Sequence, residues 1–377
     1  MKIRPLRVIV AVVVIAGAAY AFRGRLIGLF FRPDSPPAGQ AGVDLPQLGR
    51  DAVDIVAEGL VVPWEIRFLP GGDILVSERP GRLVRIADDG RRAYDVPDVR
   101  QVGEGGLMGL ALHPRFAEND LIYVCFTTES EAGLENRVER YRLGADGLSD
   151  RRVILDAIPG ASYHDGCRLE FGPDSLLYVT TGDAGDADRA QDRSSLAGKI
   201  LRLTPDGRVP DANPFGTPVY SYGHRNPQGL VWDDEGRLWS TEHGRSGLQS
   251  GLDELNLVEA GRNYGWPVIQ GSESRPEMVA PVLHSGPGYT WAPGGAAYLD
   301  GSVFFGGLRG AALYEAEVDR EGSPQLRVHF HDDFGRIRAV RLGPDGMLYF
   351  TTSNRDGRGR VRSGDDRILR VDPRRLR

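Results

Sequence analysis

A strand–turn–strand phrase recurs six times along this chain and constrains its architecture more than any other feature. In each copy an alternating apolar segment is followed by a turn of Asp, Gly or Pro and then by a second alternating segment, a pattern typical of paired antiparallel strands. The copies lie at Ile66–Ile86, Leu110–Phe126, Leu169–Asp183, Leu230–Gly244, Ala296–Ala316 and Val340–Asn354. They begin about 40 to 70 residues apart, the spacing of four-stranded propeller blades. We therefore predict an all-β, six-bladed β-propeller with four-stranded blades around a central funnel.

Composition agrees with one large β domain. The chain has 377 residues, of which 41% are hydrophobic, and its 50 glycines and 25 prolines suit a turn-dense fold. We assign residues 51–377 to the propeller. The net charge of −6 argues against nucleic acid as a partner class, because nucleic-acid binding relies on basic surfaces.

The amino terminus has a different character. Basic residues flank an apolar run: Lys2, Arg4 and Arg7 precede Val8–Phe22, and Arg23 and Arg25 follow it. The run is short for a membrane-spanning helix, which needs about 17 to 25 residues. We predict that residues 1–31 form a signal peptide or an uncleaved signal anchor, and that the Pro- and Gly-rich residues 32–50 form a linker. The protein is then periplasmic or otherwise extracytoplasmic, secreted or tethered.

Cys125 and Cys167 are the only cysteines. An exported protein permits a disulfide, but the two residues belong to different blades. We therefore expect two buried thiols rather than a bridge.

Chemistry-bearing residues concentrate where loops interrupt the repeat. His164 and Asp165 precede the third blade, where they form either a general base with its neighbour or a turn-capping pair. The segment Tyr222–Leu230, before the fourth blade, reads YGHRNPQGL. Its Arg225 offers a fork of donors suited to an oxyanion or a quinone oxygen.

Two further groups of residues are candidates for binding ions or charged ligands. Carboxylates and loop carbonyls at Glu242–Arg245, Asp253–Asn256 and Asn263–Pro267 form either a calcium site or a solvated acidic loop. Arg309 lies in the fifth blade, and Arg336 and Arg338 open the sixth. They either bind a polyanionic ligand together or are separately solvated.

These segments, in this order, resemble the glucose/sorbosone dehydrogenase family, and most of all its soluble aldose sugar dehydrogenase branch. The resemblance covers about Ala57 to Val371 and is carried by YHDGCRLEFGPD, GKILRLTPDG, YGHRNPQGL and DELNLVEAGRNYGWP. It implies a six-bladed propeller that uses pyrroloquinoline quinone (PQQ) and Ca²⁺.

The resemblance also implies roles for individual residues. His164 would be the catalytic base, and Arg225 and Asn226 would contact the quinone edge. The PQQ carboxylates would bind Arg309, Arg336 and Arg338, with Glu104 and Thr290 also near the cofactor. The carbonyls of Gly244 and Arg245 would hold the catalytic Ca²⁺, and Glu254 and Tyr264 a second, structural Ca²⁺.

The departures from the family pattern are informative. Glu104 stands where glucose-oxidising relatives carry Gln, which places a carboxylate near an anionic cofactor. The stacking Trp of those relatives aligns with Gly288, leaving Tyr289 and Trp291 as candidates to cover the PQQ face. Asp165 is the candidate orienting partner of His164.

The resulting hypothesis is PQQ-dependent oxidation of the C1 hydroxyl of aldoses to lactones. No haem C-x-x-C-H motif is present, so electrons would pass to an external quinone, cytochrome or dye. The short Thr180–Lys199 loop favours a monomer or weak dimer. The alternatives are a Ca²⁺-dependent propeller lactonase without PQQ and a non-enzymatic binding module.

Overall fold

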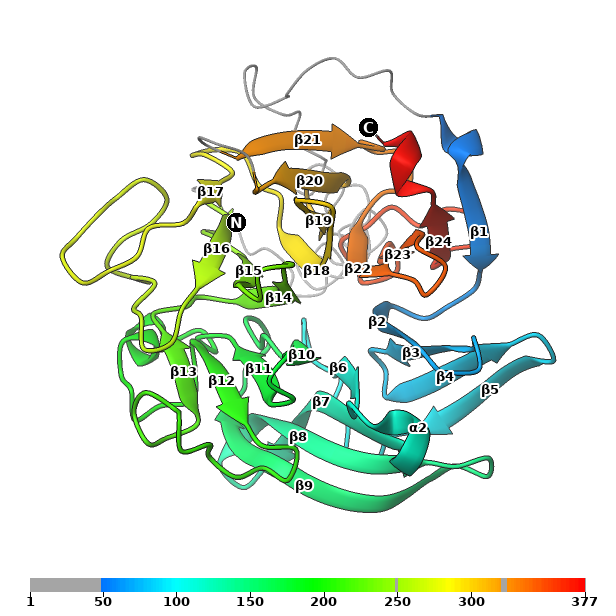
Figure 1. The fold of residues 1–377 in the computed structure, drawn as a ribbon, viewed down its shortest axis with the longest axis horizontal. Coiled ribbons are helices and arrows are strands. Elements are labelled where there is room, and N and C mark those ends of the chain that lie inside the picture. Colours follow the sequence, from blue (N-terminus) through cyan, green and yellow to red (C-terminus); the bar gives the residue numbers. More distant parts are fainter. Residues whose placement is uncertain (1–48, 248–249, 320–323, 377) are drawn as a thin grey trace, which may run out of the picture.

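A ring of six sheets forms the body of the protein (Figure 1). The computed structural model describes residues 49–247, 250–319 and 324–376, so the predicted signal sequence and nearly all of the linker lie outside the described residues. Within those ranges each sheet has four antiparallel strands, which confirms the predicted six-bladed propeller. The blades in chain order are β2–β5 (Pro63–Phe68, Ile74–Glu78, Arg82–Ala87, Gly90–Asp95), β6–β9 (Leu107–Leu112, Leu121–Ser130, Gly133–Leu143, Leu148–Pro159), β10–β13 (Leu169–Phe171, Leu177–Thr181, Lys199–Leu203, Val219–Tyr222), β14–β17 (Pro227–Trp232, Leu238–Glu242, Glu254–Val258, Leu283–His284), β18–β21 (Pro293–Leu299, Ser302–Gly307, Leu313–Glu317, Gln325–His329) and β22–β24 (Ile337–Leu342, Leu348–Thr352, Ile368–Val371) with β1 (Val53–Ala57).

Helical structure is scarce in the described chain. It comprises one short α-helix and three 3₁₀ turns: α2 (Phe116–Asn119), η1 (Arg50–Ala52), η2 (Ala187–Ala190) and η4 (Pro373–Arg375). None of the helices in residues 49–247, 250–319 and 324–376 is long and apolar enough to cross a membrane.

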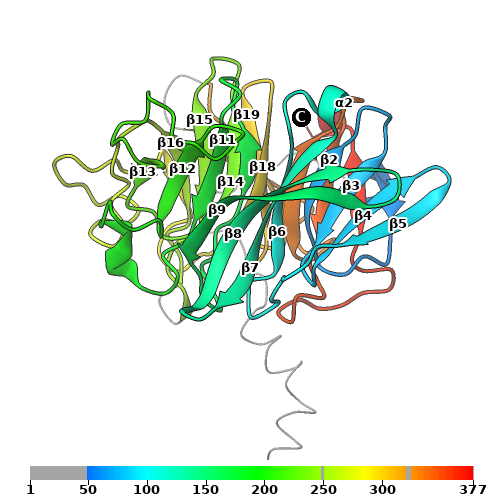
Figure 2. The same cartoon turned by 90° about the horizontal axis from the view of Figure 1, so that it is seen from below.

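The first strand of each blade lines the axis. These inner strands β2, β6, β10, β14, β18 and β22 contact one another in a closed ring, and the sheets stand side by side around them (Figures 1 and 2). Their first residues gather at one end of the axis, which we call the funnel, and their last residues at the other, which we call the reverse mouth. Five of the six inner strands carry a β-bulge near their first residues. Bulges re-aim side chains, so the fold departs from regular pairing where a site would need it.

The repeated Pro-Asp-Gly phrase forms the turn between the first two strands of a blade. Asp174, Asp233 and Asp345 each accept a hydrogen bond from the backbone N–H two residues later, at 3.1, 3.0 and 3.2 Å. Gly236 and Gly346 follow in the left-handed region, with φ of 76° and 75°. The Asp side chain and the glycine together explain why the phrase recurs.

The outer strand of the last blade is β1, which comes from the start of the propeller. Strand β1 pairs with β24 in register Val53↔Val371 and Asp54↔Arg370, and the Arg370 and Asp54 side chains form an ion pair at 2.7 Å. The sixth copy therefore needs no fourth strand of its own, and the pairing closes the ring.

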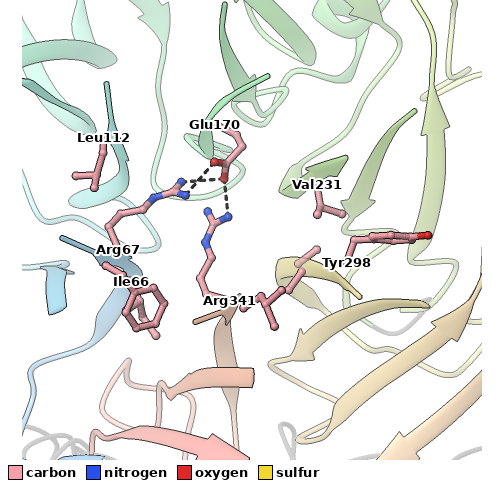
Figure 3. Close-up of a pocket in the computed structure, with 11 residues that line it drawn as sticks. Ile66, Arg67, Leu112, Glu170, Val231, Tyr298 and Arg341 are labelled. Carbon is pink, nitrogen blue, oxygen red and sulfur yellow. Dashed lines mark hydrogen bonds and ion pairs between the residues drawn. The ribbon is translucent and has the colours of Figure 1, made fainter. Parts of the chain in front are cut away.

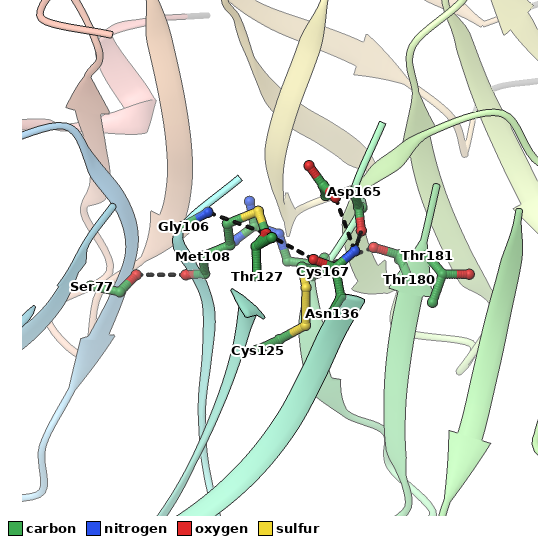
Figure 4. Close-up of a disulfide and its surroundings, with 12 residues drawn as sticks. Ser77, Gly106, Met108, Cys125, Thr127, Asn136, Asp165, Cys167, Thr180 and Thr181 are labelled. Carbon is green, nitrogen blue, oxygen red and sulfur yellow. Dashed lines mark hydrogen bonds between the residues drawn. A yellow bond between two sulfur atoms is a disulfide. The ribbon is translucent and has the colours of Figure 1, made fainter. Parts of the chain in front are cut away.

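The two cysteines are joined, contrary to our expectation of buried thiols. Cys125 in β7 and Cys167 just before β10 form a disulfide with Cα atoms 5.5 Å apart (Figure 4). Both are buried in the apolar layer between the second and third blades. Residues in different blades can face the same inter-blade layer, so membership of separate blades was no argument against pairing.

Candidate active site

A histidine–carboxylate pair lies at the funnel. His164, in the loop before β10, has left-handed backbone (φ 59°), and its Nδ1 lies 2.7 Å from Oδ1 of Asp183. Asp183 also accepts hydrogen bonds from Nε1 of Trp266 at 2.9 Å and from the N–H of Gly185 at 2.8 Å. Although burial opposes ionisation, the hydrogen bond from His164 and its charge lower the pKa of Asp183 overall. An ionised Asp183 holds the proton on Nδ1 and leaves Nε2 of His164 as the acceptor.

Asp165 does not orient His164, so that expectation is wrong. Its carboxylate accepts hydrogen bonds from Nδ2 of Asn136 at 3.0 Å and from the N–H of Ala161 at 3.1 Å (Figure 4). Burial raises the pKa of Asp165 to about 6. The carboxylate of Asp165 bonds to the neighbouring blade, while Asp183, nineteen residues after His164, contacts the imidazole.

Arg225 approaches the same pair from the fourth blade. Its guanidinium lies 5.3 Å from the Trp266 ring and donates to Oγ of Ser246 at 3.0 Å, and its carbonyl accepts from the N–H of Asp183 at 2.8 Å. The backbone N–H of Arg225 donates to Glu242. Burial lowers the pKa of Arg225, but an arginine this basic stays charged. His164, Asp183 and Arg225 therefore form one connected unit.

Arg336 and Arg338 are both buried at the funnel end of the sixth blade. Arg336 donates to Asp356 through Nε at 2.8 Å and Nη2 at 2.7 Å. Arg338 lies in the bulge of β22 and donates to Oε1 of Gln228, which lies in the bulge of β14. Burial lowers the pKa of Arg338 to about 9, and Arg336 contributes in the same direction. The two bulges thus bring a cation and an amide together across the axis.

Glu104 is neutralised by a cation that the sequence interpretation did not identify. Nη1 of Arg358 lies 2.5 Å from Oε1 of Glu104, and the N–H of His164 donates to Oε2 at 3.2 Å. Burial is the largest single effect and opposes ionisation, but the charges of Arg358 and His243 and the hydrogen bonds from Arg358 and the His164 N–H together outweigh it and lower the pKa of Glu104 to about 2. Arg358 therefore acts as the counter-ion of Glu104, so this carboxylate does not place an unpaired negative charge near an anionic ligand.

Several buried polar atoms at the funnel have no hydrogen-bond partner among the described residues. They are Asn226 Nδ2, Thr290 Oγ1, Arg225 Nε, Arg338 Nε and Arg79 Nε. Asn226 is fixed through its other atom, because Oδ1 accepts from the N–H of Gly166 at 3.0 Å. Arg309 reaches the funnel through a hydrogen bond to Oγ of Ser250 at 3.0 Å. Such unmet donors are what a site for a polar, anionic ligand presents.

The predicted catalytic calcium ligands lie next to a buried carboxylate. The N–H of Gly244 donates to Oδ1 of Asp253 at 2.7 Å, and the carbonyl of Arg245 accepts a long bond of 3.3 Å from the N–H of Gly251. Burial raises the pKa of Asp253 to about 6. In the described chain no group of three or more His, Cys, Asp or Glu side chains could hold a metal. A calcium ion here would therefore depend on backbone carbonyls.

Glu254 and Tyr264 are linked through Glu242 and His224. Burial, followed by the charge of Glu242, raises the pKa of Glu254 to about 8. Nδ1 of His224 lies 2.9 Å from Glu242, and the His224 ring stacks on Tyr264 at 4.8 Å. The Tyr264 hydroxyl donates to the carbonyl of Leu257 at 2.6 Å, so only its backbone carbonyl remains as a ligand.

The histidine–carboxylate pair is contacted by Trp266, an aromatic residue other than the two candidates to cover the PQQ face. Trp291 is fully buried and Tyr289 nearly so, both in the core of the fifth blade, and the Tyr289 hydroxyl lies 2.7 Å from that of Tyr314. Trp266 instead contacts both Asp183 and Arg225. It belongs to the NYGWP segment, whose specificity was recognised from the sequence although the role of its Trp was not.

The fold and site together define a propeller whose funnel combines a histidine–aspartate pair with an excess of arginine. The family model described as glucose/sorbosone dehydrogenase matches residues 60–369. The chain therefore belongs to the glucose/sorbosone dehydrogenase family.

Individual relatives agree over most of their lengths. An oxidoreductase (glucose dehydrogenase) from Thermus thermophilus is 46% identical, with a TM-score of 0.79 over 85% of this chain and 99% of that one. The PQQ-bound aldose sugar dehydrogenase of Streptomyces coelicolor is 40% identical, with a TM-score of 0.77 over 85% and 97%. The aldose sugar dehydrogenase YliI of Escherichia coli is 31% identical over 85% of this chain and 93% of its own.

Proposed function

We propose that this protein is a PQQ-dependent dehydrogenase that oxidises the C1 hydroxyl of an aldose to a lactone and passes the electrons to an external acceptor. The observation that carries the proposal is the His164–Asp183 pair beside the arginine-rich funnel. Similarity to the PQQ-bound enzyme of S. coelicolor supports the choice of cofactor.

The funnel residues fit an anionic cofactor. The charges of Arg336, Arg358, Asp356 and Glu104 all act on Arg79, so these groups lie close together. Arg338 belongs to the same group, so four cations face two carboxylates. PQQ carries three carboxylates, which the excess positive charge and the unmet donors would bind, with Arg309, Asn226 and Thr290 completing its contacts.

His164 would act as the general base. With Nδ1 held by Asp183, Nε2 is the nitrogen that accepts the proton of the C1 hydroxyl. When bound, PQQ would supply the two-electron acceptor chemistry that oxidation at C1 requires. Asp183 stabilises the imidazolium that forms as His164 takes the proton, and it keeps the ring in position.

Arg225 would stabilise negative charge that develops on the oxygen of the accepting group. Its guanidinium is buried, so its charge acts through a medium of lower dielectric than water. Trp266 and Ser246 hold that guanidinium in place. We assign Arg225 a catalytic role on this ground.

Calcium would bind at two places. The carbonyls of Gly244 and Arg245 would hold the ion next to the cofactor, with Arg245 using its second lone pair beside the long bond from Gly251. Glu254 would hold the structural ion with the backbone carbonyl of Tyr264. A carboxyl whose pKa is raised to about 8 gains strongly from a cation that stabilises its ionised form.

Reconstitution tests the proposal. The purified apo-protein is mixed with PQQ and Ca²⁺, and dye reduction is followed with several aldoses. We expect a PQQ-dependent rate that falls by about 10²- to 10⁴-fold in His164→Gln with PQQ still bound. His113→Gln, in the turn after β6, is the matched control and retains the rate.

The outcomes separate the alternatives. Hydrolysis of lactones without PQQ would replace the proposal with a lactonase. Absence of both activities, with PQQ not bound, would indicate a binding module. An extracytoplasmic location is proposed alongside, because the Cys125–Cys167 disulfide is stable in an oxidising compartment and the amino-terminal pattern fits export.

A further inference from the structure

A cavity lies on the propeller axis, at the reverse mouth. It measures about 340 Å³ and is lined by residues from all six inner strands (Figure 3). Its apolar wall consists of Ile66, Phe68, Leu112, Val231, Ala296, Ala297, Tyr298 and Leu342. Its polar residues are Arg67, Glu170 and Arg341. Its volume is at the lower end of the range of small-molecule sites, about 300 to 1,000 Å³.

The polar residues form a compact charged group. Glu170 accepts hydrogen bonds from Nη1 and Nη2 of Arg67, both at 2.9 Å, and lies 2.5 Å from Nη1 of Arg341 (Figure 3). Their side chains remain 12 to 17% exposed, and all three residues line the cavity.

Positive charge exceeds negative charge in this group. Below Arg341 lies the fully buried Glu65, which pairs with both Arg341 and Arg168. Three guanidiniums therefore share two carboxylates. Burial, together with Arg341, lowers the pKa of Arg67 to about 10, as expected where cations lack full compensation.

Arg341 also has donors to spare. Nε and Nη2 donate to Glu65 at 2.8 and 2.7 Å, and Nη1 approaches Glu170. A guanidinium has five N–H groups, so two of those of Arg341 have no acceptor among the described residues. Arg67 uses four of its five, on Leu110, Leu169 and Glu170.

The cavity is separate from the funnel. Between them lies the fully buried Trp64, with the guanidinium of Arg168 at 4.1 Å and that of Arg338 at 5.5 Å from its ring. Arg338 belongs to the funnel, whereas Arg168 pairs with Glu65 on the reverse side. A ligand at the reverse mouth would leave the funnel free.

We propose that the reverse mouth is a second binding site, for a small organic monocarboxylate with a compact apolar body. One negative charge matches the excess of one positive charge, and the carboxylate would accept from the spare donors of Arg341 and Arg67. The body would lie against the apolar wall, where Leu342 and Val231 line the cavity. The site is independent of sugar oxidation and stands whether or not the chain uses PQQ.

Titrations with benzoate, benzamide and acetate test this site by calorimetry or saturation-transfer NMR. Benzoate supplies both charge and body, benzamide only the body, and acetate only the charge. We expect a Kd for benzoate of about 1 mM or below, with the other two probes at least about tenfold weaker. Binding should persist with PQQ saturating the funnel.

Variants at the rim locate the site without disturbing the charged group. Leu342 ends β22 and is 38% exposed, so substitution there leaves the core intact. Leu342→Glu should weaken benzoate at least about fivefold at low salt by repulsion, whereas Leu342→Gln should change it less than twofold. Val153→Glu adds the same charge on the exposed strand β9 outside the cavity and should have no effect.

Any of four results would overturn the proposal. The first is no saturable benzoate binding up to about 10 mM, which lies tenfold above the expected Kd. The second is that benzamide binds as tightly as benzoate, and the third is that Leu342→Glu and Leu342→Gln have equal effects on benzoate binding. The fourth is displacement of benzoate by PQQ. The last result would assign the anion to the funnel.

Discussion

Replacing Asp183 with Asn tests how the structure positions the base. The change keeps the shape of the side chain but removes the carboxylate that accepts from Nδ1 of His164 at 2.7 Å. A hydrogen bond to a charged group contributes about 1.5 to 3 kcal/mol. That contribution matters most when His164 becomes positively charged by taking the substrate proton. At about 1.36 kcal/mol for each factor of ten, turnover should fall about 10- to 150-fold.

The assay is dye reduction by the PQQ-loaded enzyme at saturating aldose, with PQQ affinity measured separately. Asp165→Asn is the matched control, since Asp165 is adjacent to His164 in sequence but bonds Asn136. Turnover of Asp165→Asn should stay within about threefold of wild type, because no interaction with the imidazole is lost. Wild-type turnover in Asp183→Asn, or an equal loss in both variants, would refute the positioning argument.

Three further predictions concern cofactor binding and stability. Arg338→Gln should weaken PQQ binding about tenfold or more in a fluorescence titration, because a buried cation is lost; an unchanged Kd would contradict its role. Replacing Cys125 and Cys167 together by Ala should lower the free energy of unfolding in urea by about 4 kcal/mol, from the 42-residue separation they close; an unshifted midpoint would contradict this. Without Ca²⁺, stability should fall as pH rises from about 4.5 to 8, because unfolded Glu254 ionises before folded Glu254, whose pKa is raised to about 8. In thermal unfolding, Ca²⁺ should offset this loss in wild type, whereas Glu254→Gln should lack the loss and gain no comparable stabilisation from Ca²⁺.

The fold could be predicted from the sequence because each blade repeats the same short strand–turn–strand pattern. The Asp–Gly turn and alternating strands specify a hairpin without reference to distant residues. What sequence could not supply is contact between blades. The Cys125–Cys167 bridge and the pairing of β1 with β24 join segments whose proximity arises only when the ring closes.

The candidate site shows the same distinction between local sequence motifs, which could be read, and contacts between distant residues, which could not. His164, Arg225 and Asn226 could be proposed from the sequence because they stand in dense, specific motifs. Their partners could not, since adjacency in the chain suggested Asp165 where the structure places Asp183. Arg358, which neutralises Glu104, is 254 residues away from it and belongs to a segment rich in arginine, where no single arginine is distinguished by pattern.

Anaerobic single turnover tests the central claim most directly. The PQQ-loaded protein is mixed with an aldose in the absence of any electron acceptor, and the absorbance of the bound cofactor is followed while lactone is measured. The account predicts one lactone formed per cofactor reduced, with the rate lowered in His164→Gln. Bound PQQ that stays oxidised in the presence of every aldose tested would contradict it.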